Sequence, residues 1–242
     1  MSFPDLFSGH AKLYAAARPT YPDRVIAELA ALTPGRAQAW DCGTGNGQAA
    51  RLLADQFKAV YATDASADQI AQAVPHERIS FAVEPAEECS LPDAACDLIL
   101  AAQCIHWFDL EGFTAQARRV LRPGGIVAAL GYDWPYVDPE VDALLASDFL
   151  KPLDPYWAPG NRLIMDGYRA IDLPGEEVRL SPAAIHLAWN GERFADLIRS
   201  WSATRKLGED ALAGAFEKLA ALWPADQRRH VVMPLISRVA RL

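Results

Sequence analysis

Paired cysteines and basic runs are both missing from this sequence. It has four cysteines, which form no CxxC motif and show no zinc-ligand spacing. They are Cys42, Cys89, Cys96 and Cys104. Lysine and arginine number 23 against 31 acidic residues, which gives a net charge of -8, and no basic tail occurs. The composition therefore argues against a disulfide scaffold, a zinc ribbon and a nucleic-acid partner, and we expect reduced, mostly buried thiols.

A long apolar run is missing as well. The most apolar stretch, Ala94–Phe108, is interrupted by Asp97, Gln103 and His106 and is too short to span a bilayer. The first residues have neither the basic segment nor the apolar core of a signal peptide. We therefore expect a cytoplasmic protein with no membrane partner.

Short apolar runs do alternate with amphipathic segments over residues 25–130. Runs that predict strands occupy 37–41, 59–63, 79–83, 97–101 and 126–130. Segments with helical spacing lie at 25–32, 52–57 and 113–121, and the last helix is expected to end at Pro123-Gly-Gly125. This alternation predicts an α/β fold whose parallel sheet is covered by helices on both faces.

The pattern changes after Gly131. Residues 132–175 are rich in aromatic residues, Pro and Asp, and we expect them to form an inserted, partly helical cap. Helical spacing returns at Phe194–Trp201 and Leu212–Trp223. Ile185–Trp189 and Val231–Ile236 are expected to be two further strands that close the sheet at its edge.

A glycine cluster follows the first predicted strand and precedes a predicted helix. Gly43, Gly45 and Gly47 have the spacing GxGxG, and Gln48 follows them. The alternative GxGxxG spacing of a dinucleotide site is therefore absent, which disfavours a nicotinamide oxidoreductase. Glycines here either form only a tight turn or let the backbone approach a nucleotide-like ligand. Asp64 ends the next strand, where a carboxylate can accept hydrogen bonds from ribose hydroxyls, and this favours the ligand.

Four segments resemble the motifs of one family. Asp41-Cys-Gly-Thr-Gly-Asn-Gly47 is similar to motif I of the class I S-adenosylmethionine-dependent methyltransferases, whose usual form is D/E-x-G-x-G-x-G. Tyr61–Ser66 resembles their acidic second-strand motif, and Ala86-Glu87 with Leu91-Pro92 resembles the loop beside the adenine. Arg119–Gly125 is similar to the segment before the fifth strand. The resemblance implies a Rossmann-like fold with a mostly parallel seven-stranded sheet, helices on both faces and a helical cap insertion.

A narrower resemblance extends over most of the chain. Phe7–Pro22, Ala101–Phe108 and Ser200–Thr204 are similar to segments of the methyltransferase type 11 branch that contains trans-aconitate methyltransferase. The resemblance implies a single domain over 1–242. It would comprise an N-terminal lid and first helix at 1–34, a cofactor-binding core at 35–131, and the cap insertion with the sheet-closing part at 132–242.

The resemblance also implies where S-adenosylmethionine is bound. The cofactor-binding residues would be Tyr14, Arg18, Tyr21, Asp41, Gly43, Thr44, Gly45, Gly47, Asp64, Ala65, Ala86, Glu87, Ala101 and Gln103. Asp41 would lie near the methionyl ammonium, Asp64 on the ribose, and Arg18 near the methionyl carboxylate. Alternatives stay open, since Asp41 could bond within its loop, Glu87 could be a solvated charge, and Gln103 could cap its strand.

Aromatic residues in the second half of the chain are candidates for an acceptor pocket. We expect Trp107, Tyr132, Trp134 and Trp201 to bind the substrate, with Phe108, Tyr156 and Trp157 as further wall candidates. The alternative is that they form the core of the cap. A small polycarboxylate acceptor, as the narrower resemblance suggests, would also need cations, and Arg162, Arg199 and Arg205 lie in suitable regions.

The predicted reaction is transfer of a methyl group from S-adenosylmethionine to a small-molecule acceptor, with S-adenosylhomocysteine as the product. Oxygen is the expected acceptor atom. A carboxylate is already ionised at neutral pH, whereas a hydroxyl needs a general base, for which His106 is the candidate. A buried structural role for His106 is the alternative.

Other functions stay open or are disfavoured. A non-catalytic protein that binds the cofactor for sensing or assembly is the alternative of another class. Ile105-His-Trp-Phe108 stands where base methyltransferases carry an Asn-Pro-Pro-aromatic tetrad, so we expect no nucleic-acid substrate. No His and carboxylate cluster has metal-ligand spacing, so we expect no metal. The chain is expected to be a monomer or a homodimer.

Overall fold

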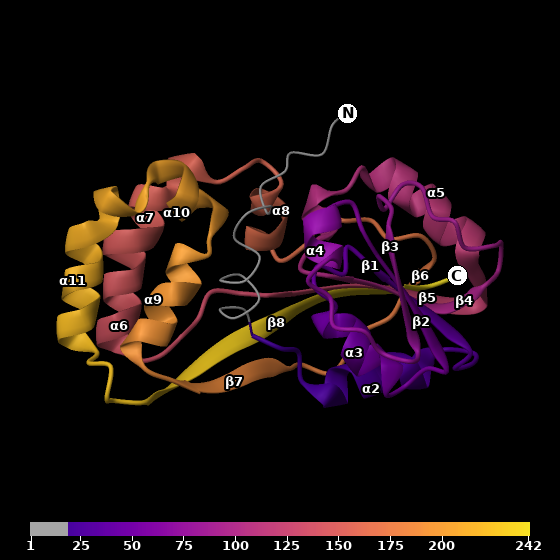
Figure 1. The fold of residues 1–242 in the computed structure, drawn as a ribbon, viewed down its shortest axis with the longest axis horizontal. Helices are drawn as coiled ribbons and strands as arrows, with labels where there is room; N and C mark the ends of the chain where they lie inside the picture. The colour runs from indigo at the N-terminus through magenta and orange to yellow at the C-terminus, as the bar shows by residue number, and fades with distance from the viewer. Residues whose placement is uncertain (1–18) are drawn as a thin grey trace.

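The computed structural model describes residues 19–242, which form a sheet-based lobe and a helical lobe side by side (Figure 1). The sheet has eight strands in this part of the chain, in the order β3-β2-β1-β4-β5-β8-β6, with β7 paired to β8. Their bounds are β1 Gln38–Cys42, β2 Ala59–Asp64, β3 Ile79–Val83, β4 Cys96–Ala102, β5 Leu121–Tyr132, β6 Glu176–Glu177, β7 Ala184–Trp189 and β8 Arg229–Arg241. Strands β1 to β5 are parallel, and the expected mostly parallel α/β sheet is confirmed with one strand more than predicted.

Alternate residues of the central strands face two separate apolar cores. Ala39 and Leu98 belong to one core, whereas their neighbours Trp40 and Ile99 belong to the other. This is the two-residue period of a strand that is buried on both faces. The sheet is therefore an internal layer, as its nearly continuous apolar runs predicted.

Helices cover both faces of this sheet. The helices of the sheet lobe are α2 Asp23–Leu32, α3 Gln48–Ala54, α4 Ala67–Ile70 and α5 Leu110–Val120, with a 3₁₀ turn at Ile105–Trp107. Leu29 of α2 and Leu53 of α3 pack into the first core, while Phe113 and Val120 of α5 pack into the second. The two cores thus lie on opposite faces of one sheet.

The expected end of α5 was wrong by a few residues. The helix ends at Val120, and β5 already begins at Leu121, whose backbone is extended. Proline has no N–H to donate to a helix and disfavours helical backbone in the residue before it. Pro123 therefore ends the helix upstream of its own position.

Residues 139–165 and 191–222 build the helical lobe and the connection to it. The helical segments are α6 Pro139–Leu144, a π-helix at Leu145–Leu150, α7 Lys151–Leu153, a 3₁₀ turn at Asp154–Tyr156, α8 Asn161–Met165, α9 Gly191–Arg199, α10 Ser202–Leu207, a 3₁₀ turn at Glu209–Leu212 and α11 Ala213–Leu222. Figure 1 shows α6, α7, α9, α10 and α11 in one lobe and α8 between the lobes. The two helices predicted near 194–201 and 212–223 are confirmed as α9 and α11.

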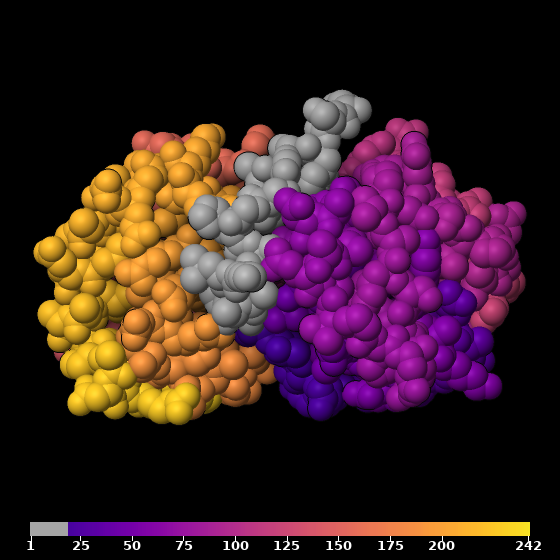
Figure 2. Space-filling model, in the orientation of Figure 1, coloured from indigo at the N-terminus to yellow at the C-terminus, as the bar shows by residue number. Residues whose placement is uncertain are grey.

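One long strand joins the two lobes. The second half of β8 pairs with β5, and its first half pairs with β7. The pair β7 and β8 thus extends from the sheet toward the helical lobe (Figure 1). In the space-filling view, the orange and yellow surface of the helical lobe and the purple surface of the sheet lobe form opposite ends of the molecule (Figure 2). Both strands were predicted, although β7 extends the sheet rather than closing its edge.

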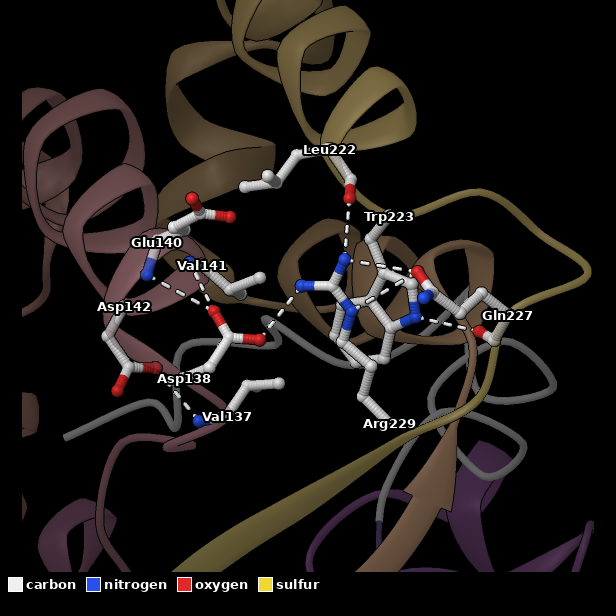
Figure 3. A network of polar contacts seen from close by, with 9 residues as sticks. All are labelled: Val137, Asp138, Glu140, Val141, Asp142, Leu222, Trp223, Gln227 and Arg229. Carbon is white, nitrogen blue, oxygen red and sulfur yellow. Dashed lines mark hydrogen bonds and ion pairs between the residues drawn. The ribbon is translucent and has the colours of Figure 1, made fainter.

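An arginine at the start of β8 fastens this strand to the helical lobe (Figure 3). Arg229 donates to Asp138 Oδ2 at 2.8 Å and to the carbonyl oxygen of Leu222 at 2.7 Å, and its guanidinium lies over the ring of Trp223. The other oxygen of Asp138 accepts from the first N–H groups of α6. One side chain therefore links β8, the start of α6 and the end of α11. Across residues 19–242, no helix is long and apolar enough to cross a membrane.

Candidate functional site

A cavity of about 730 Å³ opens at the carboxyl ends of the central parallel strands. This edge is where ligands bind in open α/β sheets. The predicted cofactor residues that line it are Tyr21, Asp41, Gly43, Thr44, Gly45, Asp64, Ala65, Ala86, Glu87 and Gln103. Gly47 and Ala101 are not among the lining residues, and Ala102 lines the cavity in place of Ala101. Tyr14 and Arg18 lie outside the described residues.

Ala101 fails to reach the cavity because of the strand period. It is fully buried in the core between the sheet and α5, together with Ile99. Its neighbour Ala102 points to the opposite face of β4, as successive strand residues do. Ala102 therefore lines the cavity, and cofactor binding by Ala101 stays a prediction.

The glycine loop is held in a conformation that side chains rarely adopt. Gly43, Gly45 and Gly47 have φ values of +71°, +57° and +89°. A Cβ on Gly43 would lie 2.7 Å from Sγ of Cys104, so the position has no room for a side chain. The N–H groups of Gly43 and Thr44 both donate to the carbonyl oxygen of Thr63 at 2.8 Å. The loop after β1 is thus fixed against the end of β2.

Asp64 lies at the end of β2 and orders the loops around the cavity. Its Oδ2 accepts from the Gly45 N–H at 2.8 Å, and its Oδ1 accepts from the Ser66 N–H at 2.9 Å. Burial raises the pKa of this carboxyl, although both backbone bonds oppose the shift. Each carboxylate oxygen has more than one acceptor site, so Asp64 can hold the loop and still receive hydroxyl groups.

Asp41 is a fully buried carboxyl group at the wall of the same cavity. Its Oδ2 accepts from Thr44 Oγ1 at 2.5 Å, while its Oδ1 has no hydrogen-bond partner among the described residues. Burial raises the pKa of Asp41 to about 7, and the Thr44 hydrogen bond opposes that shift. A buried acceptor without a donor is costly, and a cationic ligand group would satisfy it. This oxygen therefore fits the ammonium end of an amino-acid ligand.

Glu87 and Gln103 both bond to the protein and line the larger cavity. Glu87 Oε1 accepts from the N–H of Asp109 at 2.8 Å, which ties its turn to the start of α5. Gln103 has a φ of +59°, and its Oε1 accepts from the N–H of Tyr132 at 3.1 Å. Non-glycine residues with positive φ are uncommon and concentrate at functional sites. Gln103 thus bridges the ends of β4 and β5, so its two predicted roles are compatible.

A smaller cavity of about 80 Å³ adjoins the larger one. Both cavities are lined by Gln103, Trp107 and Tyr132. Trp134, Trp157 and Trp201 complete the aromatic wall, with ring centroids 5.2 to 5.9 Å apart in pairs. The four predicted substrate residues are therefore brought together, and Trp157 belongs with them.

His106 lines the smaller cavity and is held by a residue that the sequence did not single out. Its Nδ1 lies 3.0 Å from the hydroxyl oxygen of Tyr168, which is completely buried. Gly160 passes so close that a Cβ there would lie 2.2 Å from the carbonyl oxygen of His106. Tyr168 is 62 positions away in the chain, and no local pattern could have paired it with His106.

The three candidate arginines do not line either cavity. Arg162 pairs with Asp154 at 2.7 Å, and Arg199 pairs with Asp196 and Glu209 at 3.1 and 2.7 Å. Within residues 19–242, no group of three His, Cys, Asp or Glu residues is placed to hold a metal ion.

Several known proteins that this chain resembles are named as methyltransferases. The family model described as "Methyltransferase domain" matches residues 40–129. A protein of Anaeromyxobacter dehalogenans, named a "putative type II methyltransferase", has a solved structure with a TM-score of 0.85 and 39% identity. That match covers 93% of this chain and 97% of the other. It therefore extends over both lobes.

Curated relatives match over shorter stretches. A Dictyostelium discoideum protein named "putative methyltransferase" is 33% identical over 170 residues, which is 69% of this chain and 65% of the relative. A Saccharomyces cerevisiae protein named a "probable S-adenosylmethionine-dependent methyltransferase" is 28% identical. That match covers 76% of this chain and 61% of the yeast protein. The chain thus spans a little under two thirds of the length of these two relatives.

Proposed function

Since the chain belongs to the class I S-adenosylmethionine-dependent methyltransferases, we propose that it transfers a methyl group from S-adenosylmethionine to an oxygen atom of a small-molecule acceptor. The observation that carries the proposal is the junction of the two cavities at Gln103, Trp107 and Tyr132. A cofactor in the larger cavity and an acceptor in the smaller one would meet at these three residues. The whole chain, 1–242, would act as one domain, because both lobes contribute to the paired cavities.

The carboxylates of Asp41 and Asp64 would hold the cofactor. Asp41, with its oxygen that lacks a donor, would receive the methionyl ammonium, and Asp64 would receive the ribose hydroxyls. Ala65 and Ala86 lack bulky side chains and would leave room for the adenine, and Glu87 would lie beside its amino group. The pKa of Asp41 is raised to about 7, so below that pH its carboxyl group is protonated in the free protein. Binding of the ammonium group would then be accompanied by loss of this proton.

The aromatic wall would orient the acceptor and exclude water. Bound S-adenosylmethionine supplies a methyl group that its positively charged sulfur has already activated. The remaining task of the protein is to align an oxygen nucleophile with that carbon in a site without competing water. Trp107 and Tyr132 border both cavities, and Trp134 and Trp201 back them with apolar surface.

Calorimetric titration with S-adenosylmethionine, S-adenosylhomocysteine and NADH tests the cofactor half of this proposal. We expect micromolar binding of the two sulfur compounds, about -8 kcal/mol, and no binding of NADH. Preferential binding of NADH, or no binding of the sulfur compounds, would contradict the proposal. Turnover is tested separately, by the acceptor experiments below.

A further inference from the structure

Two exposed histidines lie next to each other on the ribbon that β7 and β8 form. In the register of these strands, His186 of β7 lies opposite Val232, and His230 of β8 lies opposite Ala188. The two histidines are therefore diagonal neighbours on one face of the ribbon, where long side chains can meet. They are 44 positions apart in the chain, and no local spacing in the sequence pairs them.

The two imidazole rings face each other through one nitrogen each. Nδ1 of His186 lies 3.1 Å from Nε2 of His230, and the ring planes are inclined by 14°. The ring centroids are 5.1 Å apart, farther than these two nitrogens, so the nitrogens lie on the facing sides of the rings. Among residues 19–242, no other side chain forms a hydrogen bond or an ion pair with either ring.

A metal ion can replace the hydrogen bond between these rings. In the hydrogen-bonded pair, one of the facing nitrogens carries a hydrogen and the other has a lone pair. When that hydrogen moves to the outer nitrogen of its own ring, both facing nitrogens have lone pairs. Both imidazoles stay neutral in this exchange, and a neutral imidazole nitrogen is the commonest metal ligand in proteins. The pair therefore has the chemistry of two metal ligands.

The separation of the two nitrogens also suits ligands of one ion. Zinc binds imidazole nitrogen at about 2.0 to 2.1 Å, so two such ligands are about 3.3 Å apart at a tetrahedral angle and about 2.9 Å apart at a right angle. The observed 3.1 Å lies between these two values. Imidazole suits Zn²⁺, Ni²⁺ and Cu²⁺, whereas Mg²⁺ and Ca²⁺ prefer oxygen ligands.

The ribbon holds both histidines in place. Ile185 and Val231, which precede and follow them along their strands, are buried in the core on the opposite face of the ribbon. The backbone of β7 is paired with β8 over its whole length, Ala184–Trp189. Ligands on paired strands lose less freedom when an ion binds than ligands on a loop do. Binding therefore needs only a small adjustment of the two side chains.

We propose that His186 and His230 form a surface site for a divalent transition-metal ion such as Zn²⁺ or Ni²⁺. Nδ1 of His186 and Nε2 of His230 are two of its ligands. Water fills the other positions, because residues 19–242 place no group of three His, Cys, Asp or Glu residues to hold a metal. The ion links β7 to β8 where the ribbon extends toward the helical lobe (Figure 1), one residue from Arg229. The site lines neither cavity, so the inference does not depend on the proposed function.

Calorimetric titration of the whole chain with NiCl₂ and with MgCl₂ tests the site. We expect Ni²⁺ to bind and Mg²⁺ not to bind. His186→Gln and His230→Gln should each weaken Ni²⁺ binding at least about tenfold, because a single imidazole replaces a chelating pair. Both side chains are exposed, so these variants should fold.

His76→Gln is the matched control for these variants. The Nδ1 of His76 accepts from the N–H of Arg78, and no second histidine hydrogen-bonds to this ring. Ni²⁺ affinity should therefore stay unchanged in His76→Gln. No binding of Ni²⁺, a loss in only one of the two ribbon variants, or equal affinities in all three variants would overturn the inference.

Nitrogen-15 NMR of labelled histidine identifies the ligand atoms. Addition of Zn²⁺ should shift Nδ1 of His186 and Nε2 of His230 together and leave the ring nitrogens of His76 in place. Zn²⁺ should also raise the melting temperature of the unaltered protein but not of His186→Gln, because an ion that binds only the folded ribbon stabilises it. Shifts in only one of the two ribbon histidines, or in neither, would overturn the site.

Discussion

The two cavities of this protein are built in different ways. The larger one is shaped by backbone turns and carboxylates at strand ends, mostly in segments that follow one another between residues 41 and 109. The smaller one is shaped by side chains, and four of the seven tryptophans line it. These tryptophans come from positions as distant as Trp107 and Trp201. A site built from local turns requires its residues at fixed spacings in the sequence, whereas a site built from distant side chains does not.

This difference predicts different responses to substitution. The larger cavity should be sensitive to changes of backbone conformation and of charge. The smaller cavity should tolerate changes of charge nearby but depend on how the helical lobe is fastened to the sheet. The substitutions below test this contrast, from the largest expected effect to the smallest.

Replacement of Gly43 should have the largest effect. In Gly43→Ala the new Cβ meets Cys104 Sγ at 2.7 Å in a backbone conformation with φ +71°. Strain and overpacking together should lower the free energy of unfolding by about 3 kcal/mol and abolish binding of S-adenosylhomocysteine. Urea denaturation and calorimetric titration measure the two effects.

Gly167→Ala is the matched control for this substitution. Gly167 also has a positive φ, +67°, but no atom lies within 4 Å of its Cβ position. Backbone strain alone should cost about 1 kcal/mol, and cofactor binding should not change. A similar loss of stability in both variants would show that the close contact with Cys104 is not what makes Gly43 necessary.

Asp64→Ala comes next. It removes the acceptor of the Gly45 and Ser66 N–H groups together with the proposed ribose contact. Affinity for S-adenosylhomocysteine should weaken by about 2 kcal/mol. Asp68→Ala, an exposed carboxylate in the following helix, should leave affinity unchanged. Unchanged affinity in Asp64→Ala would remove that carboxylate from the proposed binding site.

Cofactor affinity should also depend on pH through Asp41. Burial raises the pKa of this carboxyl from its ordinary value of 3.8 to about 7, so below pH 7 it is protonated in the free protein. An ammonium ligand pairs with the ionised form, so affinity for S-adenosylhomocysteine should fall about tenfold per pH unit below that pKa. Titrations between pH 5.5 and pH 8.5 measure the slope. Asp41→Asn should bind more weakly and show a flatter profile, and an equally steep profile would assign the proton to another group.

The raised pKa of Asp41 also affects the stability of the free protein. Stability should fall as pH rises, whereas cofactor affinity should increase. Between about pH 4 and pH 7 the unfolded chain has released the Asp41 proton while the folded protein keeps it. The contribution of Asp41 to the free energy of unfolding should therefore decrease as pH rises through this range. Comparison of wild type with Asp41→Asn by urea denaturation at several pH values isolates this contribution.

Substitution of the arginine that fastens β8 to the helical lobe should have the smallest effect on stability. Arg229→Met removes the hydrogen bonds to Asp138 and to the Leu222 carbonyl that Figure 3 shows, and should cost about 1 kcal/mol. Arg162→Met removes an exposed pair with Asp154 and should cost less than about 0.5 kcal/mol. Urea denaturation of both variants measures the two losses. Equal losses of stability in the two variants would mean that the network does not fasten β8 to the helical lobe.

The sequence predicted the strands and turns that depend on local residue patterns. Each central strand was predicted from its apolar run, because most positions of a strand buried on both faces are apolar. The glycine loop was predicted because a sharp turn restricts which residues can occupy it, and Asp64 was predicted because it ends the next strand. The helix α5 ends a few residues before its predicted end, because Pro123 disfavours helical backbone in the residues before it.

Contacts between distant segments could not be predicted. Tyr168 reaches His106 only because α8 places residues 161–168 against the turn after β4. The strand β8 joins both lobes because it pairs with two different strands. Its apolar pattern does not indicate which strands these are. Such contacts are fixed by tertiary packing, which a single sequence does not display.

The most direct test of the account uses S-adenosylmethionine with a deuterated methyl group. The protein is incubated with this cofactor and with equal concentrations of phenol and benzoate, and the products are identified by mass spectrometry. The account predicts label on an oxygen atom of at least one of the two acceptors. No label in either product while the cofactor is bound would contradict it.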